Sequence, residues 1–295
     1  MLRSGAMPLA RLSETSLFYR EVGQGDPLLV VHGGLGSDHT YLRALDGLAD
    51  GARVVYFDQR GNGRSPEVPE ERITFDALCR DIAELADHLG IERFGLLGQS
   101  FGGYVALEFA LRHPERLTGL VLMDTAPRHR TACEAEAQTA AIVDRWPHLR
   151  SAMEAPWPRD DAEFAQQVDE LTPVFFHRYD AERVAPHYRD VAWRVAAMRA
   201  GDRILQRWDV TARLHEIDVP TLVLAGRHDI VIPCRHATTL AERIPNATVR
   251  IFEESGHNAF IEEPEAFFST LRRWLARTSA RRASPRPEPG VAETV

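Results

Sequence analysis

One short stretch of the chain constrains its fold more than any other. Residues 94–97 form an apolar run, residues 98–102 have the sequence Gly-Gln-Ser-Phe-Gly, and residues 104–111 carry a helical pattern. A buried strand that passes through Gly-x-Ser-x-Gly into a helix is typical of a nucleophile elbow, a tight turn that strains the backbone of its serine. Glycines on either side avoid collisions with the neighbouring strand and helix. We therefore expect Ser100 to project from the end of a strand.

Short apolar runs alternate with helical patterns along most of the chain. An apolar stripe predicts a helix from Phe75 to Leu89, with Thr74 as its N-cap and Gly90 after its end. Strands that alternate with helices indicate an α/β fold with a mostly parallel central sheet and helices on both faces. Residues 17–22 predict an additional antiparallel strand at one edge. The other expected strands lie at 28–31, 53–57, 94–97, 117–123, 221–225 and 248–252.

The alternation stops between two of these strands. Helix-forming stretches at 134–146, 161–171 and 191–199 replace it, and an insertion of this length predicts a helical cap over the mouth of an active site. The expected domains are an α/β core at 7–125 and 209–277, a helical cap at 126–208 and a disordered tail at 278–295. The composition of the tail cannot bury a core.

Aromatic side chains are frequent in the predicted cap. We expect most of them to pack the cap onto the core and the rest to line an apolar pocket. They are Trp146, Trp157, Phe164, Phe175, Phe176, Tyr179, Tyr188, Trp193 and Trp208.

A serine hydroxyl is a poor nucleophile near neutral pH, so it needs a base and a third group that holds the base. Asp229 follows the strand at 221–225, and His257 follows the next strand, so Ser100, Asp229 and His257 are the expected triad in a known chain order. Asp124 is the alternative acid, because it ends the strand after the elbow helix and can reach the same imidazole. The sequence Gly-x-x-Asp-x-x-x-Pro around Asp229 favours that residue.

Other histidines compete for the role of the base. His228 and His236 do not follow a strand in the required order, so we expect them at the surface or behind the site. His32 ends the first strand of the parallel sheet, where we expect it to orient a loop rather than to take part in chemistry.

Attack on a carbonyl creates an oxyanion, which preorganised N–H groups stabilise. The backbone N–H of Phe101, in the first turn of the elbow helix, is one expected donor. The sequence His-Gly-Gly-Leu-Gly at 32–36 supplies the second, for which Gly34 is preferred and Leu35 is next. This loop lacks the Gly-Lys-Ser/Thr and Gly-x-Gly-x-x-Gly patterns of phosphate-binding loops.

Charge and composition exclude several classes of function. The net charge is −8, which argues against a nucleic-acid partner, and no run of about twenty apolar residues predicts a membrane span. No apolar segment near the N-terminus indicates a secretory signal. Cys79, Cys133 and Cys234 form no metal-like cluster and are expected as free thiols in a reducing cytoplasm, with Cys79 in the core. We therefore predict a cytoplasmic protein with no metal and no organic cofactor.

Taken together, the motifs at 32–34, 58–65, 98–102 and 256–257 and the acid Asp229 resemble those of the α/β-hydrolase superfamily over about residues 9–276. The sequence Asp-Gln-Arg-Gly-Asn-Gly-Arg-Ser at 58–65 is similar to that of proline iminopeptidases and is common in related esterases and lactonases. Two positions depart from the iminopeptidase pattern. Leu35 stands where that family usually has proline, and Gln99 stands where its elbow often has an aromatic residue.

The resemblance implies a serine hydrolase that acts through an acyl-enzyme. We expect a small-molecule acyl substrate, either a carboxylic ester or a lactone. A proline iminopeptidase-like aminopeptidase is the first alternative. A cofactor-free perhydrolase or lyase and a ligand receptor that retains the triad also stay open, as do the natural substrate and the oligomeric state.

In the peptidase alternative, acidic residues of the cap would bind the free amine of the substrate. The candidates by charge are Glu134, Glu136, Glu154, Asp160, Asp161, Glu163, Asp169 and Glu170, although charged residues on such helices usually face solvent. The charged side chains at 58–65 are expected to make their loop rigid through ion pairs rather than to contact the substrate.

Overall fold

The computed structural model describes residues 8–34 and 36–283, and eight of its strands form one sheet. The strands are β1 (Leu9–Arg11), β2 (Ser16–Val22), β3 (Asp26–Val31), β4 (Ala52–Phe57), β5 (Phe94–Gln99), β6 (Leu117–Met123), β7 (Thr221–Gly226) and β8 (Ala247–Phe252). Their order is β1-β2-β4-β3-β5-β6-β7-β8, and every neighbouring pair from β4 to β8 is parallel. The predicted fold class is confirmed.

The antiparallel part of the sheet differs from the prediction in one respect. β2 runs antiparallel to β4, as expected, but it is not the edge strand, because β1 pairs with its outer side. With three residues, β1 is too short to show a periodic pattern in the sequence.

Ten α-helices surround and extend the sheet in the described part of the chain. They are α1 (Phe75–His88), α2 (Phe101–Arg112), α3 (Ala132–Arg145), α4 (Arg150–Met153), α5 (Asp161–Leu171), α6 (Ala181–Tyr188), α7 (Val195–Leu205), α8 (Arg235–Arg243), α9 (Ala259–Glu262) and α10 (Pro264–Ala283). Six 3₁₀ helices are interspersed, η1 (His39–Leu48), η2 (Glu70–Arg72), η3 (Pro114–Arg116), η4 (Pro147–Leu149), η5 (Thr172–Phe175) and η6 (Thr211–Glu216).

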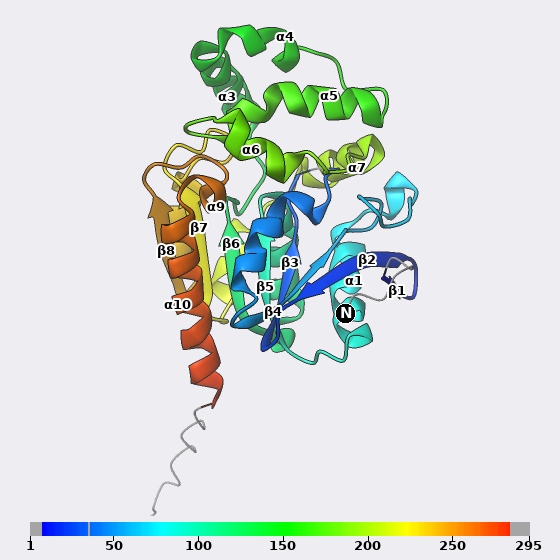
Figure 1. Ribbon diagram of the computed structural model, residues 1–295, viewed down its shortest axis with the longest axis vertical. Coiled ribbons are helices and arrows are strands. Elements are labelled where there is room, and N and C mark those ends of the chain that lie inside the picture. Colours follow the sequence, from blue (N-terminus) through cyan, green and yellow to red (C-terminus); the bar gives the residue numbers. More distant parts are fainter. Residues whose placement is uncertain (1–7, 35, 284–295) are drawn as a thin grey trace, which may run out of the picture.

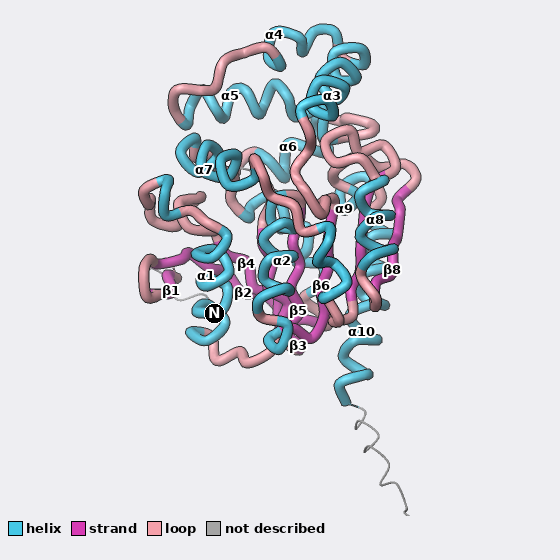
Figure 2. The backbone as a smooth tube through the Cα atoms, turned by 180° about the vertical axis from the view of Figure 1, so that it is seen from behind, coloured by secondary structure: helices cyan, strands magenta, loops and turns pink. Residues whose placement is uncertain are grey.

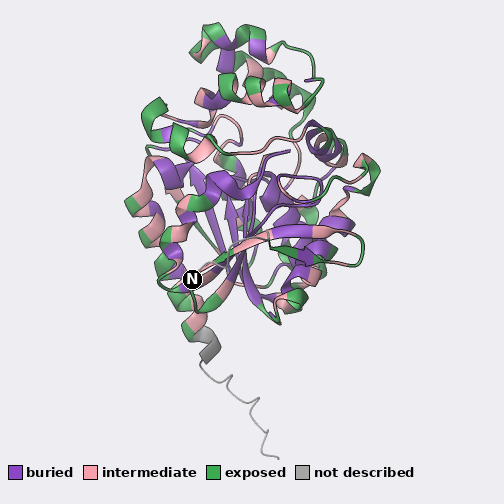
Figure 3. Cartoon of the chain, turned by 45° about the vertical axis from the view of Figure 1, so that its right-hand side comes forward, coloured by how far each residue is buried: buried purple, intermediate pink, exposed green. Residues whose placement is uncertain are grey.

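The sheet is covered on both faces, which explains its unbroken apolar strands. Successive side chains of a strand point to opposite faces. Leu29 and Val31 of β3 belong to a buried cluster with residues of α1, α2 and α8, whereas Leu28 and Val30 belong to a second cluster with residues of η1, α9 and α10. Figure 1 shows α10 on one face, and Figure 2 shows α1, α2 and α8 on the other. The central strands β3 to β7 are almost wholly buried (Figure 3), whereas β8 at one edge exposes half of its residues.

Helix α1 illustrates how local sequence sets the boundaries of an element. The side chain of Thr74 accepts a hydrogen bond from the backbone N–H of Ala77, as an N-cap does. Gly90 follows the helix with φ +67°, a conformation that favours glycine. Cys79 is buried within the same core.

Helices α3 to α7 form an insertion between β6 and β7. The insertion lies over the carboxyl ends of the parallel strands (Figure 1). α3 and α5 fall where the sequence predicts helices. The third expected helix, at 191–199, begins only at Val195, because Ala192 and Arg194 donate backbone hydrogen bonds to Asp38 and Gly36 of the core. We call residues 126–208 the cap, and the exact domain boundaries stay predictions.

The C-terminal helix α10 extends six residues into the segment 278–295 that is expected as a tail. Thr278 is held by its hydroxyl, which donates to the carbonyl of Trp274 in the preceding turn. The rest of that segment, 284–295, lies outside the described residues. In the described ranges, no helix combines the length and apolarity needed to cross a membrane.

Candidate active site

Ser100 occupies the tight turn between β5 and α2. Its φ is +51°, which is strained for a residue with a side chain, and its backbone N–H donates to the carbonyl of Met123. A Cβ atom on Gly98 would lie 2.3 Å from the carbonyl oxygen of Gly102, and one on Gly102 would lie 2.2 Å from that of Val31. Only glycine fits at both positions, so the turn holds Ser100 at the carboxyl end of the sheet.

Asp229 and His257 come together from the loops that follow β7 and β8. The imidazole Nδ1 of His257 donates to Oδ2 of Asp229 at 2.7 Å, and the two residues are only 5% and 4% exposed. Oδ1 of Asp229 accepts hydrogen bonds from the backbone N–H groups of Val231 and Ile232. Because Nδ1 carries the donated proton, Nε2 of His257 is left with a lone pair that can accept one.

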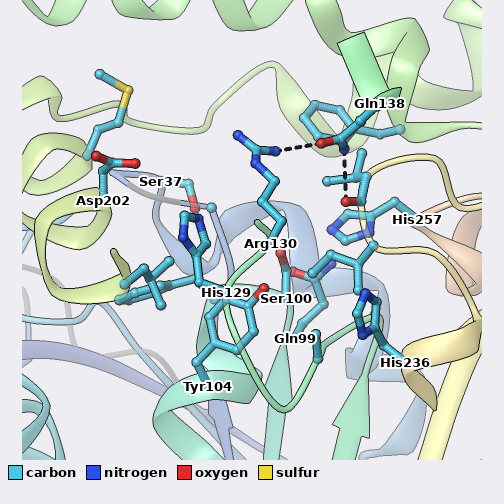
Figure 4. A pocket seen from close by; sticks show the side chains of 18 of the residues that line it. Ser37, Gln99, Ser100, Tyr104, His129, Arg130, Gln138, Asp202, His236 and His257 are labelled. Carbon is cyan, nitrogen blue, oxygen red and sulfur yellow. Dashed lines mark hydrogen bonds between the residues drawn. The ribbon is translucent and has the colours of Figure 1, made fainter. Parts of the chain in front are cut away.

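The loop of His257 is also tied to the cap. The backbone N–H of His257 donates to the carbonyl of Phe175 at 2.8 Å, and the rings of the two residues lie 5.9 Å apart. His257 and Ser100 line the same cavity (Figure 4). The chain thus brings the three residues of the expected triad to one end of the sheet.

The alternative acid, Asp124, lies against the same pair. It is 1% exposed with φ +49°, and its Oδ1 accepts from the backbone N–H of Gly226. Its Oδ2 has no hydrogen-bond partner among the described residues. Burial, and after it the negative charge of Asp229, raise the pKa of Asp124 well above its ordinary value. Both causes favour the protonated form of Asp124, which lies beside the Asp229–His257 pair.

Among the described residues, three of these side chains also lie close enough together to be considered as ligands of a metal ion. One ligand atom each of Asp124, Asp229 and His257 lies within 4.8 Å of the others. The 2.7 Å contact between Nδ1 and Oδ2 is a hydrogen-bond distance, and both oxygens of Asp229 already accept N–H groups. These donors fit a relay between carboxylate and imidazole.

The loop after β3 lies beside the serine. A Cβ atom on Gly33 would lie 2.8 Å from the Cβ of Ser100. The N–H of Gly33 donates to the hydroxyl of Tyr41, which in turn donates to Oε1 of Gln99. Gln99 thus fixes this loop from the position before the serine, and Gly34 lines the cavity next to Ser100.

Phe101 is the first residue of α2, so its N–H lacks an intrahelical acceptor. Gly34 and Phe101 both line the cavity that Ser100 lines, and the oxyanion-binding role of their N–H groups stays a prediction. Leu35, the next candidate, lies outside the described residues. His32 holds this loop, because its Nδ1 donates to the carbonyl of Gly33 and its Nε2 accepts from the N–H of Gln59.

The cavity above Ser100 measures about 340 Å³ and is lined by residues of both the core and the cap. Four of the nine aromatic residues singled out in the cap sequence line it, and three aliphatic or thioether side chains of the cap helices join them. They are Phe164, Phe175, Tyr188, Trp193, Val168, Met198 and Leu205. Tyr188 accepts a hydrogen bond from Asn258, the residue after the catalytic histidine candidate. A small or medium apolar substrate portion fits such a wall.

Charged side chains also line the cavity. Of the eight cap acids named from the sequence, Glu134 alone lines the cavity, and it is paired with Arg128 and Arg235 and bound to the N–H of Thr131. Asp202, on α7, lines the cavity without an ion pair among the described residues. Sequence reasoning missed Asp202, because no motif shows which face of a cap helix will turn toward the core.

His236 lies closer to the site than expected, and His228 contacts the cap. His236, expected at the surface or behind the site, is buried and lines the cavity from α8. Burial is the main cause that lowers the pKa of His236 below its ordinary value. His228 stacks on His177 of the cap with ring centroids 3.6 Å apart. The amphipathic pattern of α8 turns His236 inward, which its position relative to the strands does not show.

Ion pairs and hydrogen bonds hold the loop at 58–65, and none of its residues lines the cavity. Asp58 accepts from the imidazole of His39 and from the backbone N–H of Arg64. Arg60, 1% exposed, pairs through two hydrogen bonds of 2.7 Å with Asp81 of α1. The loop therefore supports the site through ion pairs, as the sequence suggests.

Comparison with known proteins adds the relatives of the chain. The family model described as alpha/beta hydrolase fold matches residues 26–264. A proline iminopeptidase of Clostridioides difficile (strain 630) is 31% identical over 281 residues, which cover 88% of this chain and 94% of that protein.

Two solved structures are similar along most of their length. A thermophilic esterase from Thermogutta terrifontis has a TM-score of 0.72 at 28% identity, covering 90% of this chain and 94% of that one. The enol-lactonase from Burkholderia xenovorans LB400 has a TM-score of 0.75 at 25% identity, covering 91% of this chain and 100% of that one.

Proposed function

This chain belongs to the alpha/beta hydrolase fold family, and from that premise we propose that it is a serine hydrolase that cleaves a carboxylic ester or a lactone. The resemblance seen in its motifs is confirmed by the family match and by the iminopeptidase relative. One observation carries the proposal. The buried hydrogen-bonded pair of Asp229 and His257 lines one end of the sheet together with the strained serine, Ser100.

In the proposed reaction, Oγ of Ser100 attacks the acyl carbon while Nε2 of His257 takes its proton. Asp229 holds the imidazole in the tautomer with Nδ1 protonated and stabilises the imidazolium that forms. The N–H groups of Phe101 and Gly34 donate to the oxyanion of the tetrahedral intermediate. The imidazolium then protonates the leaving oxygen as the bond to the acyl carbon breaks.

The second half of the reaction restores the enzyme. A water molecule gives a proton to His257 and attacks the acyl carbon of the acyl-enzyme. Collapse of the second tetrahedral intermediate releases the carboxylic acid and returns the proton to Ser100. For a lactone, the alcohol and the acid leave as one molecule. Each proton is taken and returned by this one imidazole.

An ester or a lactone is favoured over a prolyl peptide by the charges of the cavity. Glu134, the one predicted cap acid that lines it, is neutralised by two arginines and is not free to bind an amine. The pKa of Glu134 lies far below its ordinary value, chiefly because Arg128 donates to it. The esterase and the enol-lactonase among the similar structures agree with this preference.

A proline iminopeptidase is the second candidate. Two observations favour it, the similarity to the Clostridioides difficile enzyme and the presence of Asp202 in the cavity without an ion pair. A free carboxylate could accept hydrogen bonds from the amine of an N-terminal proline. The cytoplasmic location expected from the sequence stays a prediction under either candidate.

A panel of acyl substrates separates the two candidates. We expect p-nitrophenyl butyrate and a small lactone to be hydrolysed with a higher kcat/KM than proline p-nitroanilide, and Ser100→Ala to abolish all of these activities. If the prolyl amide is the best substrate, the peptidase assignment replaces ours. If the Ser100→Ala variant retains the activity of the wild type, neither assignment stands.

A further inference from the structure

Arg130 is the cation of the cavity that has no acidic partner among the described residues. Three arginines line the cavity, and two of them, Arg128 and Arg235, form ion pairs with Glu134. The guanidinium of Arg130 donates to the neutral oxygen Oε1 of Gln138 at 2.7 Å. A neutral acceptor leaves the full positive charge in place, together with the remaining N–H donors.

Gln138 is itself fixed. Its Nε2 donates to the backbone carbonyls of Ile230 and Val231, at 2.8 and 2.9 Å, in the loop that carries Asp229. These two bonds settle the orientation of the amide, so its oxygen faces Arg130. The cation is thereby held by the same loop that positions the acid of the candidate triad.

The place of Arg130 in the cavity is visible in Figure 4, where its side chain extends between Ser100 and Gln138. Its charge acts on the buried Tyr104, which also lines the cavity. Burial raises the pKa of Tyr104, and the positive charge of Arg130 opposes that rise. Asp202 lies on the other side of the cavity, near His129 (Figure 4). The two unpaired charges are thus separated across the cavity.

We propose that Arg130 and Gln138 form a carboxylate-binding subsite, so that the substrate is an ester or lactone that carries a carboxylate group besides the scissile bond. This inference rests on the proposed function. An arginine matches the planar carboxylate with two N–H donors, and one unpaired guanidinium matches one negative charge. The apolar wall of the cap would then contact the carbon chain between the carboxylate and the reacting carbonyl.

The test uses p-nitrophenyl esters that differ in the charge of the acyl terminus. Monoesters of glutaric, adipic and pimelic acid are compared with neutral alkanoates of equal length and with the ester of 6-aminohexanoic acid. We expect the best anionic ester to exceed its neutral counterpart by about tenfold or more in kcat/KM, as a charge-assisted hydrogen bond provides. Because Arg130 is exposed at the mouth, added salt should reduce this preference.

Three variants locate the effect. Arg130→Gln should lower the ratio of anionic to neutral kcat/KM about tenfold, whereas Arg130→Lys should retain part of it. Arg150→Met, an exposed arginine of α4 that does not line this cavity, should leave the ratio unchanged. A wild-type preference for the neutral or the cationic ester would overturn the proposal, as would an equal loss of both activities in Arg130→Gln.

A binding experiment keeps this inference distinct from the proposed function. Calorimetry with the Ser100→Ala variant should detect adipate but not hexanol, and the additional Arg130→Gln substitution should weaken adipate binding about tenfold. If esters are hydrolysed through Ser100 without a charge preference, the function stands and the subsite fails. If no ester is hydrolysed, the proposed function fails, and the subsite is judged by adipate binding alone. Binding that the Arg130→Gln substitution weakens supports the subsite, and absent or unchanged binding overturns it.

Discussion

Two buried aspartates near one imidazole have different roles in this account. Asp229 accepts three hydrogen bonds, one from the imidazole of His257 and two from backbone N–H groups. Asp124 accepts one backbone N–H and faces the negative charges of Asp229 and Glu262. The surroundings of Asp124 therefore favour its protonated form.

The raised pKa of Asp124 predicts how the stability of the protein depends on pH. Its pKa is raised in the folded protein above the ordinary value of 3.8, so above about pH 4 the unfolded chain releases this proton while the folded chain keeps it. The stability that the folded state gains from the neutral acid is therefore lost as pH rises. Asp124→Asn, which does not titrate, should become progressively more stable than the wild type.

Urea unfolding of both proteins from pH 4 to pH 8 measures this difference. The free energy of unfolding of the variant minus that of the wild type should increase by up to about 1.4 kcal/mol per pH unit until the pKa of the folded state is reached. A difference that stays constant over this range would mean that Asp124 is ionised in the folded protein.

At the same scale, the sequence predicted residues marked by a motif and missed those that depend on tertiary packing. Ser100, Asp229 and His257 each follow a strand, and parallel strands end at one edge of a sheet. Asp202 and Gln138 lie on cap helices with polar residues on several faces. Which of these faces turns inward depends on how the cap sits on the core, and no local pattern carries that information.

At the scale of elements, the elbow has the least freedom. A methyl group on Gly102 would lie 2.2 Å from the carbonyl oxygen of Val31 and 2.6 Å from that of His32, both backbone atoms of β3 or its end. Gly102→Ala should therefore cost about 3 kcal/mol or more of the free energy of unfolding, because α2 must move away from the sheet.

Gly51→Ala is the matched control, since no atom lies within 4 Å of the added methyl group. It should change the free energy of unfolding by less than about 0.5 kcal/mol. Urea midpoints of the two variants give the comparison, and equal midpoints would show that the elbow tolerates a side chain.

Strands were the elements that the sequence predicted best. Parallel strands that are buried on both faces are continuous apolar runs, as in β3–β7, and the strand expected at 248–252 corresponds to β8, half of whose residues are exposed. Helix α6 was missed because Pro186 lies inside it and disrupts a helical pattern. The start of α7 was predicted four residues too early, since contacts with the core hold the segment before Val195 out of the helix.

At the scale of the whole molecule, Arg60 connects segments far apart in the sequence. Its guanidinium binds Asp81 of α1, lies 3.5 Å from Glu14 in the β1–β2 turn, and donates to the carbonyl of Arg72. Arg60→Met should cost about 3–5 kcal/mol, because it leaves the carboxylate of Asp81 buried and uncompensated.

The double variant Arg60→Met/Asp81→Leu tests whether the loss in Arg60→Met comes from the unpaired charge of Asp81. It removes both charges and should cost clearly less than Arg60→Met alone. Denaturant unfolding of the two single variants and the double variant completes the cycle. If the double variant costs as much as the sum of the single ones, the two side chains do not stabilise each other.

The central claim is that Ser100 is the nucleophile that becomes acylated, with His257 as its base and Asp229 holding that base. Mass spectrometry after treatment with a fluorophosphonate measures this most directly, with the rates of modification compared between variants. We predict one adduct on Ser100, none in Ser100→Ala, a rate lowered by orders of magnitude in Asp229→Asn, and a rate near that of the wild type in Asp124→Asn. An adduct on another residue, or a wild-type rate in Asp229→Asn, would contradict the account.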